Sequence, residues 1–123
     1  MKKANPYDAA CPTRLILDRI GDKWTVLLLG LLESGPVRFN QLRKRIDGLS
    51  QKVLSQTLKG LERDGLIHRK AFATVPVTVE YSITPLGETL TAIVHNLVSW
   101  AETHIEEVQT AQRRYDTGVS PKA

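Results

Sequence analysis

The sequence predicts a mostly α-helical domain with one small β-hairpin, a fold of the α+β class. Three observations lead to this prediction. Apolar residues recur at helical spacing in four successive segments between Cys11 and Asp64. Apolar and polar residues then alternate strictly from Val77 to Thr84, which is typical of a half-buried strand. A long amphipathic helical pattern runs from Pro85 to about Arg113.

Length and charge narrow the possible functions. The chain has 123 residues, 41% hydrophobic and 24% charged, which are ordinary values for one globular domain. Seventeen Lys and Arg against thirteen Asp and Glu give a net charge of +4. Between Val37 and Lys59, Asp47 is the single acidic residue among six basic ones. This polarised positive charge favours a polyanionic partner.

Several kinds of site and location are disfavoured by the sequence. Cys11 is the one cysteine, so no disulfide can form within the chain and a Cys-based metal site is not expected. The three histidines show no ligand spacing. The N-terminus has no apolar signal core, and the longest apolar stretch, 26–32, is too short to cross a bilayer. We expect a cytoplasmic protein without metal or cofactor.

The N-terminal third is predicted to hold an arm and two helices. Residues 1–10 are mostly polar or small, and we expect them to form a flexible arm. Cys11-Pro12-Thr13 opens a short helix through Arg19, with proline in its first turn. Asp22 caps a second helix from Lys23 to Glu33. Because this second helix is apolar almost all round, we expect it at the centre of the core.

The next segment reads as two short helices joined by a tight turn. The first repeats its apolar residues from Phe39 to Ile46, and Asp47-Gly48-Leu49 forms the turn. The second helix runs from Ser50, a good N-cap, to Asp64, after which Gly65 suits the left-handed position. Its outer face is polar and basic. Two helices of this kind are the parts of a helix-turn-helix.

The remainder of the chain predicts a hairpin and a terminal helix. Strands at 66–72 and 77–84 are joined by residues 73–76, and a hairpin placed directly after a helix-turn-helix is a wing. The terminal helix, about residues 85–113, carries more apolar surface than one small domain needs. We therefore expect this helix to bury part of its apolar stripe in a second subunit. Residues 11–113 are assigned to a winged helix-turn-helix domain, and 114–123 to a disordered tail.

Four stretches resemble, in their order and spacing, the HxlR family of bacterial winged helix-turn-helix transcription regulators. They are Cys11-Pro12, IGDKWTVLLLGLL (20–32), GPVRFNQLRKRIDGLSQKVLSQTLKGLERDGLIHR (35–69) and VEYSITPLG (79–87). The resemblance implies a homodimer, with an interface formed by the terminal helices, that binds a roughly palindromic DNA operator with one recognition helix per major groove. Two departures are that Asp22 replaces the family's usual glycine, and that the wing tip, 74–78, lacks the basic residue of many relatives. We expect a sequence-specific regulator of double-stranded DNA that acts as a repressor.

Residue chemistry selects the candidate DNA contacts. Glutamine pairs with adenine and lysine with guanine by two-point hydrogen bonding, each good pair giving about 1–3 kcal/mol of discrimination. The candidates for the groove, which we call the recognition face, are Gln51, Lys52, Ser55, Gln56 and Lys59. Lys59 is assigned to phosphate, and Ser50 is a helix cap first and a DNA contact second. Phosphate contacts are also assigned to Arg38 and Arg43, and in the wing to Arg69 and Lys70.

Each of these assignments has a plainer alternative. In the plainer alternative, half of the recognition face contacts phosphates or only water. Arg69 and Lys70 either flank the DNA backbone or simply keep the hairpin soluble. The predicted dimer interface consists of apolar residues from the first and last helices, namely Leu15, Leu90, Ile93, Leu97 and Trp100.

Cys11 has two interpretations. As a small hydrophobic residue near the dimer interface it would be inert. As the residue that opens a helix, it would have its thiolate favoured by the exposed N–H groups and the helix dipole. The resemblance adds that a cysteine at this place senses oxidants or electrophiles in some members. Cys11 would then be alkylated, or join an intersubunit or small-thiol disulfide, and shift the recognition helices.

Other functions fit the sequence less well. A winged-helix module that uses its basic face on an acidic protein, without sequence-specific DNA binding, stays open as the alternative. A thiol enzyme is disfavoured because no His or carboxylate is placed to serve Cys11 as a base. A metal-sensing regulator lacks ligands. We therefore expect no catalytic residue.

Overall fold

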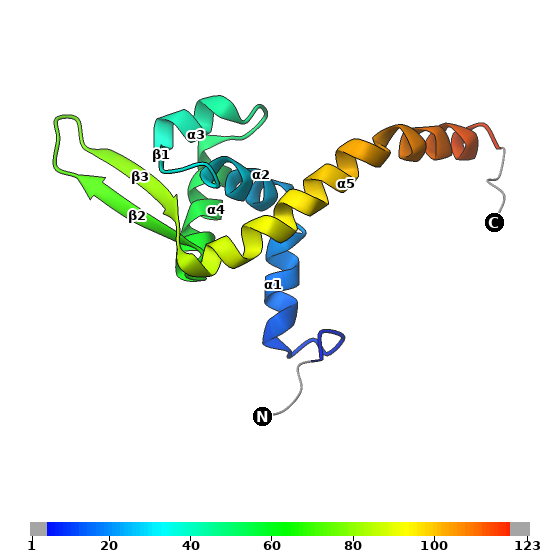
Figure 1. The fold of residues 1–123 in the computed structure, drawn as a ribbon, viewed down its shortest axis with the longest axis horizontal. Coiled ribbons are helices and arrows are strands. Elements are labelled where there is room, and N and C mark those ends of the chain that lie inside the picture. Colours follow the sequence, from blue (N-terminus) through cyan, green and yellow to red (C-terminus); the bar gives the residue numbers. More distant parts are fainter. Residues whose placement is uncertain (1–4, 119–123) are drawn as a thin grey trace.

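The computed structural model describes residues 5–118, and its elements follow the predicted order. The elements are, in order along the chain, α1 (Pro12–Ile20), α2 (Lys23–Leu32), β1 (Val37–Arg38), α3 (Phe39–Arg45), α4 (Gln51–Arg63), β2 (Ile67–Phe72), β3 (Thr78–Ile83) and α5 (Pro85–Asp116). Figure 1 shows α2, α3 and α4 gathered together, with the β2–β3 hairpin extending to one side and α5 leading away to the other. Within this described part, no helix is long and apolar enough to cross a membrane.

Helix α4 is capped at both ends, as the sequence predicted. The Ser50 hydroxyl accepts a hydrogen bond from the Val53 backbone N–H at 3.2 Å. At the other end Gly65 has a φ of +76°, a conformation that favours glycine. The Leu66 N–H donates to the Leu61 carbonyl at 3.0 Å, which completes a Schellman-type ending. The start and end of α4 are therefore fixed by local sequence.

The core lies between α2, α3, α4 and the sheet. Its fully buried side chains are leucines for the most part, namely Leu28, Leu29, Leu32, Leu42, Leu54, Leu58 and Leu61. Helix α2 is central, as expected, but it is not enclosed on all sides. Leu27 remains 42% exposed because it lines an open apolar groove with Gly30 and Val98, where α5 passes α2. Helix α2 is therefore buried on its core side and open to solvent along the groove.

The sheet has three strands in the order β1-β3-β2, with antiparallel pairing throughout. The sequence predicted the hairpin but not its pairing with the two-residue strand β1. In the structure Val37 pairs with Tyr81 and Arg38 with Glu80. Strand β1 thereby joins the start of α3 to the middle of β3.

The two ends of the chain differ from the predicted boundaries. Helix α5 continues to Asp116, past the predicted end near 113, and the Thr117 hydroxyl donates to the Arg113 carbonyl at 2.9 Å. Residues 114–116 are therefore helical and are not part of a disordered tail. In the predicted arm, residues 5–10 form hydrogen-bonded turns, such as Asp8 N–H to the Asn5 carbonyl at 3.1 Å. The rest of the predicted arm, 1–4, and of the tail, 119–123, lies outside the described residues.

Candidate nucleic-acid interface

The turn between α3 and α4 is anchored on both sides. Gly48 has a φ of +81°, which lets the chain reverse without steric cost. On either side of the turn, Ile46 and Leu49 are each 8% exposed and belong to the core. Because the flanking residues are buried, the orientation of α4 relative to α3 is set by packing as well as by the turn.

Helix α4 separates a buried face from an exposed one. Leu54, Leu58 and Leu61 have no exposed surface, and Thr57 donates its hydroxyl to the Val53 carbonyl at 2.8 Å. The opposite side is the recognition face: Gln51, Lys52, Gln56 and Lys59 are exposed, and Ser55 is half-buried. The structure therefore brings the predicted groove residues together on one side of one helix.

Charge along this exposed side is not uniform. The turns of α4 from Gln51 to Lys59 carry no acidic side chain, whereas Glu62 is exposed in the last turn. A carboxylate in that position repels phosphate. Contact with a nucleic acid is thus favoured at the N-terminal part of α4, which is also the part that contacts base edges in helix-turn-helix proteins.

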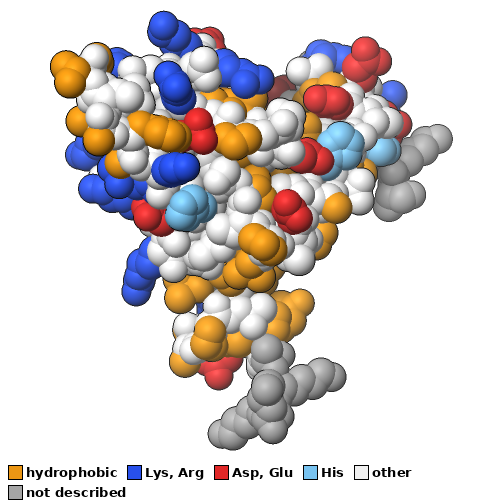
Figure 2. All heavy atoms as spheres, turned by 60° about the vertical axis from the view of Figure 1, so that its left-hand side comes forward, with side chains coloured by type: hydrophobic (Ala, Val, Ile, Leu, Met, Phe, Trp, Pro, Cys, Tyr) orange, Lys and Arg blue, Asp and Glu red, His pale blue; other side chains and the backbone are white. Residues whose placement is uncertain are grey.

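Helix α3 adds a basic edge next to α4. Arg38 is exposed at the N-cap position of α3, and Arg43, Lys44 and Arg45 are exposed in its last turn. Positive charge in the last turn of a helix is favoured by the helix dipole. Figure 2 shows Lys and Arg side chains gathered along the left and upper parts of the molecule, whereas its lowest coloured part is mostly apolar or uncharged.

The two basic residues predicted in the wing differ in their surroundings. The Lys70 Nζ atom lies 5.0 Å from the centre of the Phe72 ring, and Lys70 is the register partner of Glu80. Glu80 is also the register partner of Arg38 in β1, so one acidic residue stands between two predicted phosphate ligands across the sheet. Arg69 pairs with Tyr81, on the other face of the strand, and is exposed. Arg69 is consequently the wing cation with no acidic register partner.

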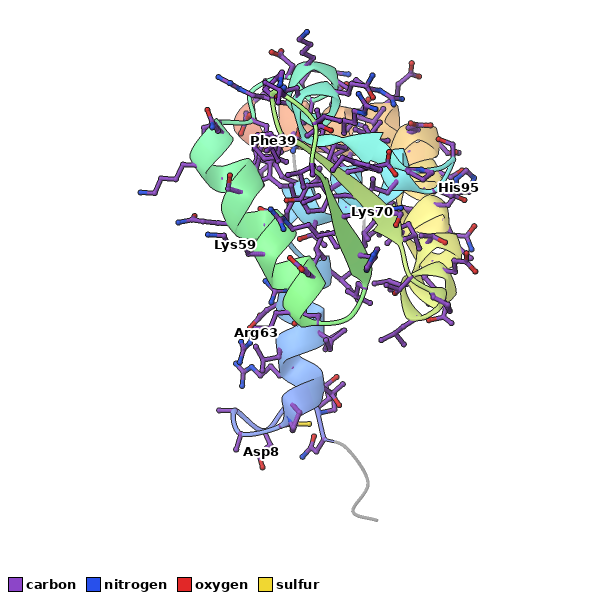
Figure 3. All side chains as sticks on the ribbon, turned by 90° about the vertical axis from the view of Figure 1, so that its left-hand side faces the viewer. Asp8, Phe39, Lys59, Arg63, Lys70 and His95 are labelled. Atoms are coloured by element: carbon purple, nitrogen blue, oxygen red, sulfur yellow. The ribbon has the colours of Figure 1, made fainter. Side chains whose placement is uncertain are left out.

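The predicted dimer residues lie apart from the recognition face. In Figure 3, Lys59 and Arg63 lie along α4 at one edge of the domain, and His95 of α5 lies at the opposite edge. Leu15 of α1 and three residues of α5 are exposed to solvent, at 66% for Leu15, 60% for Ile93, 46% for Leu97 and 56% for Trp100. Leu90 instead packs against the core of its own chain.

Cys11 occupies the N-cap position of α1 and is partly exposed. A hydrogen bond from the Thr13 side chain lowers the pKa of the Cys11 thiol, more than partial desolvation raises it. No cluster of three or more His, Cys, Asp or Glu side chains suited to a metal ion occurs among residues 5–118.

An ion pair that the sequence did not indicate joins α1 to the end of α4. The Arg19 Nε atom lies 2.7 Å from Asp64 Oδ2, and Nη2 lies 3.4 Å from Oδ1. It is the one salt bridge formed within the described part of the chain. A signal was present in Gly60, since a glycine inside an otherwise regular helical pattern often has a packing reason.

These features define a winged helix-turn-helix domain, the class of fold in which a β-hairpin wing follows the recognition helix. The sequence matches the HxlR-like helix-turn-helix family over residues 19–109. The HTH-type transcriptional regulator YtfH of Escherichia coli (strain K12) is 43% identical over 108 residues, which are 88% of this chain and 86% of YtfH. The chain belongs to the HxlR-like helix-turn-helix family, whose matched relatives are transcriptional regulators and not enzymes.

Solved structures agree with this assignment. The YtfH structure from Salmonella typhimurium matches with a TM-score of 0.87 at 38% identity, covering 91% of this chain and all of that one. The redox regulator HypR matches in its reduced form with a TM-score of 0.74 at 36% identity, covering 80% of this chain and 98% of HypR. Its oxidised form matches with a TM-score of 0.70 at 40% identity, covering 76% and 96%. The predicted family, fold class and regulator class are confirmed.

Proposed function

We propose that this protein is a homodimeric transcription regulator that binds double-stranded DNA sequence-specifically in the cytoplasm and represses its target genes. The observation that carries the proposal is the recognition face of α4. Its exposed glutamines and lysines lie together on a stretch of α4, 51–59, that contains no acidic residue. The other face of the helix is buried in the core. Such a rigid, polar and basic helix surface suits the major groove.

Each exposed side chain has a distinct role in this proposal. Gln51 and Gln56 read base edges, and Lys52 reads guanine. Lys59, together with Arg38 and Arg43 from the neighbouring elements, binds phosphates and fixes the position of the domain on the duplex. Exchanging a base-reading side chain for alanine then costs about 1–3 kcal/mol on the preferred sequence, whereas losing a phosphate contact weakens binding to all sequences alike.

The wing contributes less charge than its sequence suggested. Lys70 lies near the Phe72 ring and is the register partner of Glu80, whereas Arg69 has no acidic register partner, so Arg69 is the wing residue that we assign to the DNA backbone. The tip is apolar, with Val75 fully exposed. Contacts of the tip with DNA are therefore expected to depend on shape rather than on charge.

The dimer is proposed to form through α1 and α5. Exposed apolar side chains occur on both helices, at Leu15, Ile16 and Leu17 of α1 and at Ile93, Leu97, Trp100, Ile105 and Val108 of α5. Monomeric proteins rarely leave so many large apolar side chains exposed along two helices. A twofold dimer places two recognition helices in successive major grooves, about 34–36 Å apart, and so requires a roughly palindromic operator.

Cys11 is proposed as the sensor of a small oxidant or electrophile. It is partly exposed, its pKa is lowered by Thr13, and HypR, a similar protein, is a redox regulator. On alkylation, Cys11 Sγ bonds to an electrophilic carbon and the thiol proton is released. On oxidation by diamide, two thiols join in a disulfide and the reagent takes up both hydrogens. The second thiol is the partner subunit's own cysteine or a small thiol.

Equilibrium binding across a salt series tests the DNA-binding proposal. The reduced protein is titrated with two duplexes, the intergenic DNA beside its gene and a scrambled control. We expect a steep negative salt slope and a preference of at least about a thousandfold for the first. In Gln56→Ala the preference should fall while the salt slope stays unchanged, and in Lys59→Ala the slope should become shallower. Equal and weak binding of both duplexes, together with capture of an acidic protein, would instead favour a protein-interaction module.

The sensing proposal has a separate test. Cys11→Ser should bind the preferred duplex as the wild type does, and its affinity should no longer respond to diamide or a quinone. If Cys11→Ser still releases DNA under these reagents, the sensor is not Cys11. An electrophoretic mobility assay with and without reductant measures both proteins under the same conditions.

A further inference from the structure

Helix α1 is weakly attached to the domain except at its last turn. No residue of α1 is buried, and Leu15 and Leu17 are mainly exposed. Only Arg19 and Ile20, the last two residues, are half-buried. The first turn, which carries Cys11, lies about 12 Å along the helix axis from Arg19. The position of the whole helix therefore depends on the contacts made at its C-terminal end.

Arg19 makes its contacts with the recognition helix. Its guanidinium bonds both carboxylate oxygens of Asp64, the residue that ends α4. The side chains of Arg19 and Asp64 are only 29% and 18% exposed, so the pair is less screened than a surface ion pair. A two-point Arg–carboxylate contact also fixes orientation, which a lysine does not. One turn of α4 is thus held by one side chain of α1.

Gly60 leaves the space that the Arg19 guanidinium occupies. A Cβ atom built on Gly60 would lie 2.5 Å from Arg19 Nη1 and 2.9 Å from Cζ, far closer than side chains normally approach. The guanidinium therefore lies directly on the backbone of α4. Glycine inside a helix is unfavourable relative to alanine. Here it leaves the space that lets Arg19 reach Asp64.

We propose that Arg19 is a positioning residue that couples α1 to the recognition helix through Gly60 and Asp64. A change at α1, whether a second subunit packing on it or a modification of Cys11, moves the last turn of α4 through this contact. By reciprocity, DNA bound to α4 restrains α1. This inference rests on the proposed function, because it takes α4 as the DNA-reading helix.

Two substitutions remove the contact in different ways. Arg19→Met removes the guanidinium and keeps an apolar stem. Gly60→Ala keeps both charged residues but places a methyl group where the Arg19 guanidinium lies. Because the guanidinium is the end of a flexible side chain, we expect Arg19 to move and α4 to stay in place. Gly60→Ala should also favour the helix. If Arg19 had a purely structural role, Gly60→Ala would be more stable than the wild type and would keep the coupling between α1 and α4.

Matched controls are present in the chain. Gly30 lies inside α2, and a Cβ built there meets nothing within 4 Å, so Gly30→Ala gives the same gain in helix propensity without touching Arg19. Arg14, exposed on α1, gives a control for charge in Arg14→Met. In both controls, the amide exchange of α1 should be the same as in the wild type.

The experiment is amide hydrogen exchange of α1, read by mass spectrometry on the full chain with and without the preferred duplex. In the free protein, α1 should exchange about fivefold faster in Arg19→Met and Gly60→Ala than in the wild type, the effect of an ion pair worth about 1 kcal/mol. DNA should slow the exchange of α1 in the wild type and both controls. In the two coupling variants DNA should bind and leave α1 unchanged.

Each outcome decides the proposal. Equal exchange of α1 in the wild type, Arg19→Met and Gly60→Ala overturns it, and so does DNA protection of α1 that persists in both variants. If no duplex binds specifically, the proposed function fails, and the free-protein comparison still decides whether Arg19 holds α1 to α4. Alkylation of Cys11 with N-ethylmaleimide adds a reciprocal readout: a loss of DNA affinity that is equal in the wild type and in Gly60→Ala also overturns the coupling.

Discussion

Helices α4 and α5 are both amphipathic, yet they use their apolar sides differently. In α4 the leucines at 54, 58 and 61 are completely buried within the chain. In α5 only Val94 is buried among the large apolar residues, while Ile93, Leu97 and Trp100 stay exposed. The first helix completes a core. The second begins on that core and then leaves it, as Figure 1 shows.

An amphipathic pattern in the sequence therefore reveals that a helix has an apolar face, but not whether the same chain or a partner covers that face. Helix α5 has 32 residues and so is about 48 Å long, more than a domain of this size can cover. Its exposed residues continue well past Val94, at Ile105 and Val108. The part of α5 beyond the domain is where we expect a second subunit, and α4 is where we expect DNA.

The largest contrast should appear when one leucine is shortened in each helix. Leu58→Ala leaves a cavity in a site with no exposed surface and should lower the free energy of unfolding by about 3 kcal/mol. Leu97→Ala, on the exposed side of α5, should leave the unfolding of the domain core within about 0.5 kcal/mol of the wild type. Urea unfolding followed by circular dichroism, at a low protein concentration, measures both. Equal losses in the two variants would mean that Leu97 belongs to the core of the chain.

A charge on α5 tests what covers its exposed side. Leu97→Asp should convert a dimer to a monomer, because the interface would bury two unpaired carboxylates, while the domain itself stays folded. Sedimentation equilibrium gives the oligomeric state, and far-ultraviolet circular dichroism gives the helix content. Glu102→Gln is a control that changes charge at an exposed position of the same helix. An unaltered mass for Leu97→Asp, matching that of the wild type, would place the subunit interface elsewhere.

The same contrast explains what could be predicted from the sequence. Helices, caps and the hairpin follow from local chemistry, such as the Ser50 cap and Gly65, and these predictions were confirmed. The recognition face follows from helical spacing. The pairing of β1 with β3 joins residues 42 and 44 positions apart, and the Arg19–Asp64 contact joins residues 45 positions apart, so no local pattern specifies them. Only Gly60, out of place in a regular helix, pointed toward such a contact.

The caps of the two helices offer a smaller contrast. The Ser50 hydroxyl makes one bond at the start of α4, and Ser50→Ala should cost about 1 kcal/mol. The Thr84 hydroxyl accepts from Gly87 N–H at 3.0 Å and also donates to the Gly65 carbonyl at 2.6 Å, which ties the start of α5 to the end of α4. Thr84→Ala should therefore cost more, about 2 kcal/mol. Thermal or urea unfolding ranks the variants, and the reverse order would contradict a tertiary role for Thr84.

The smallest effect concerns the start of α1, where a cysteine stands at the N-cap position that serine fills in α4. The hydrogen bond from Thr13 favours the thiolate, so Cys11 should be alkylated by iodoacetamide with a midpoint at lower pH than a free cysteine. Thr13→Val keeps the shape, removes the donor and should move that midpoint to higher pH, which slows alkylation near neutral pH. Thr13→Ser, which retains the hydroxyl, should behave as the wild type. Identical pH profiles for Thr13→Val and the wild type would show that the hydroxyl does not tune the thiol, and the helix N-terminus alone would then account for any activation of Cys11.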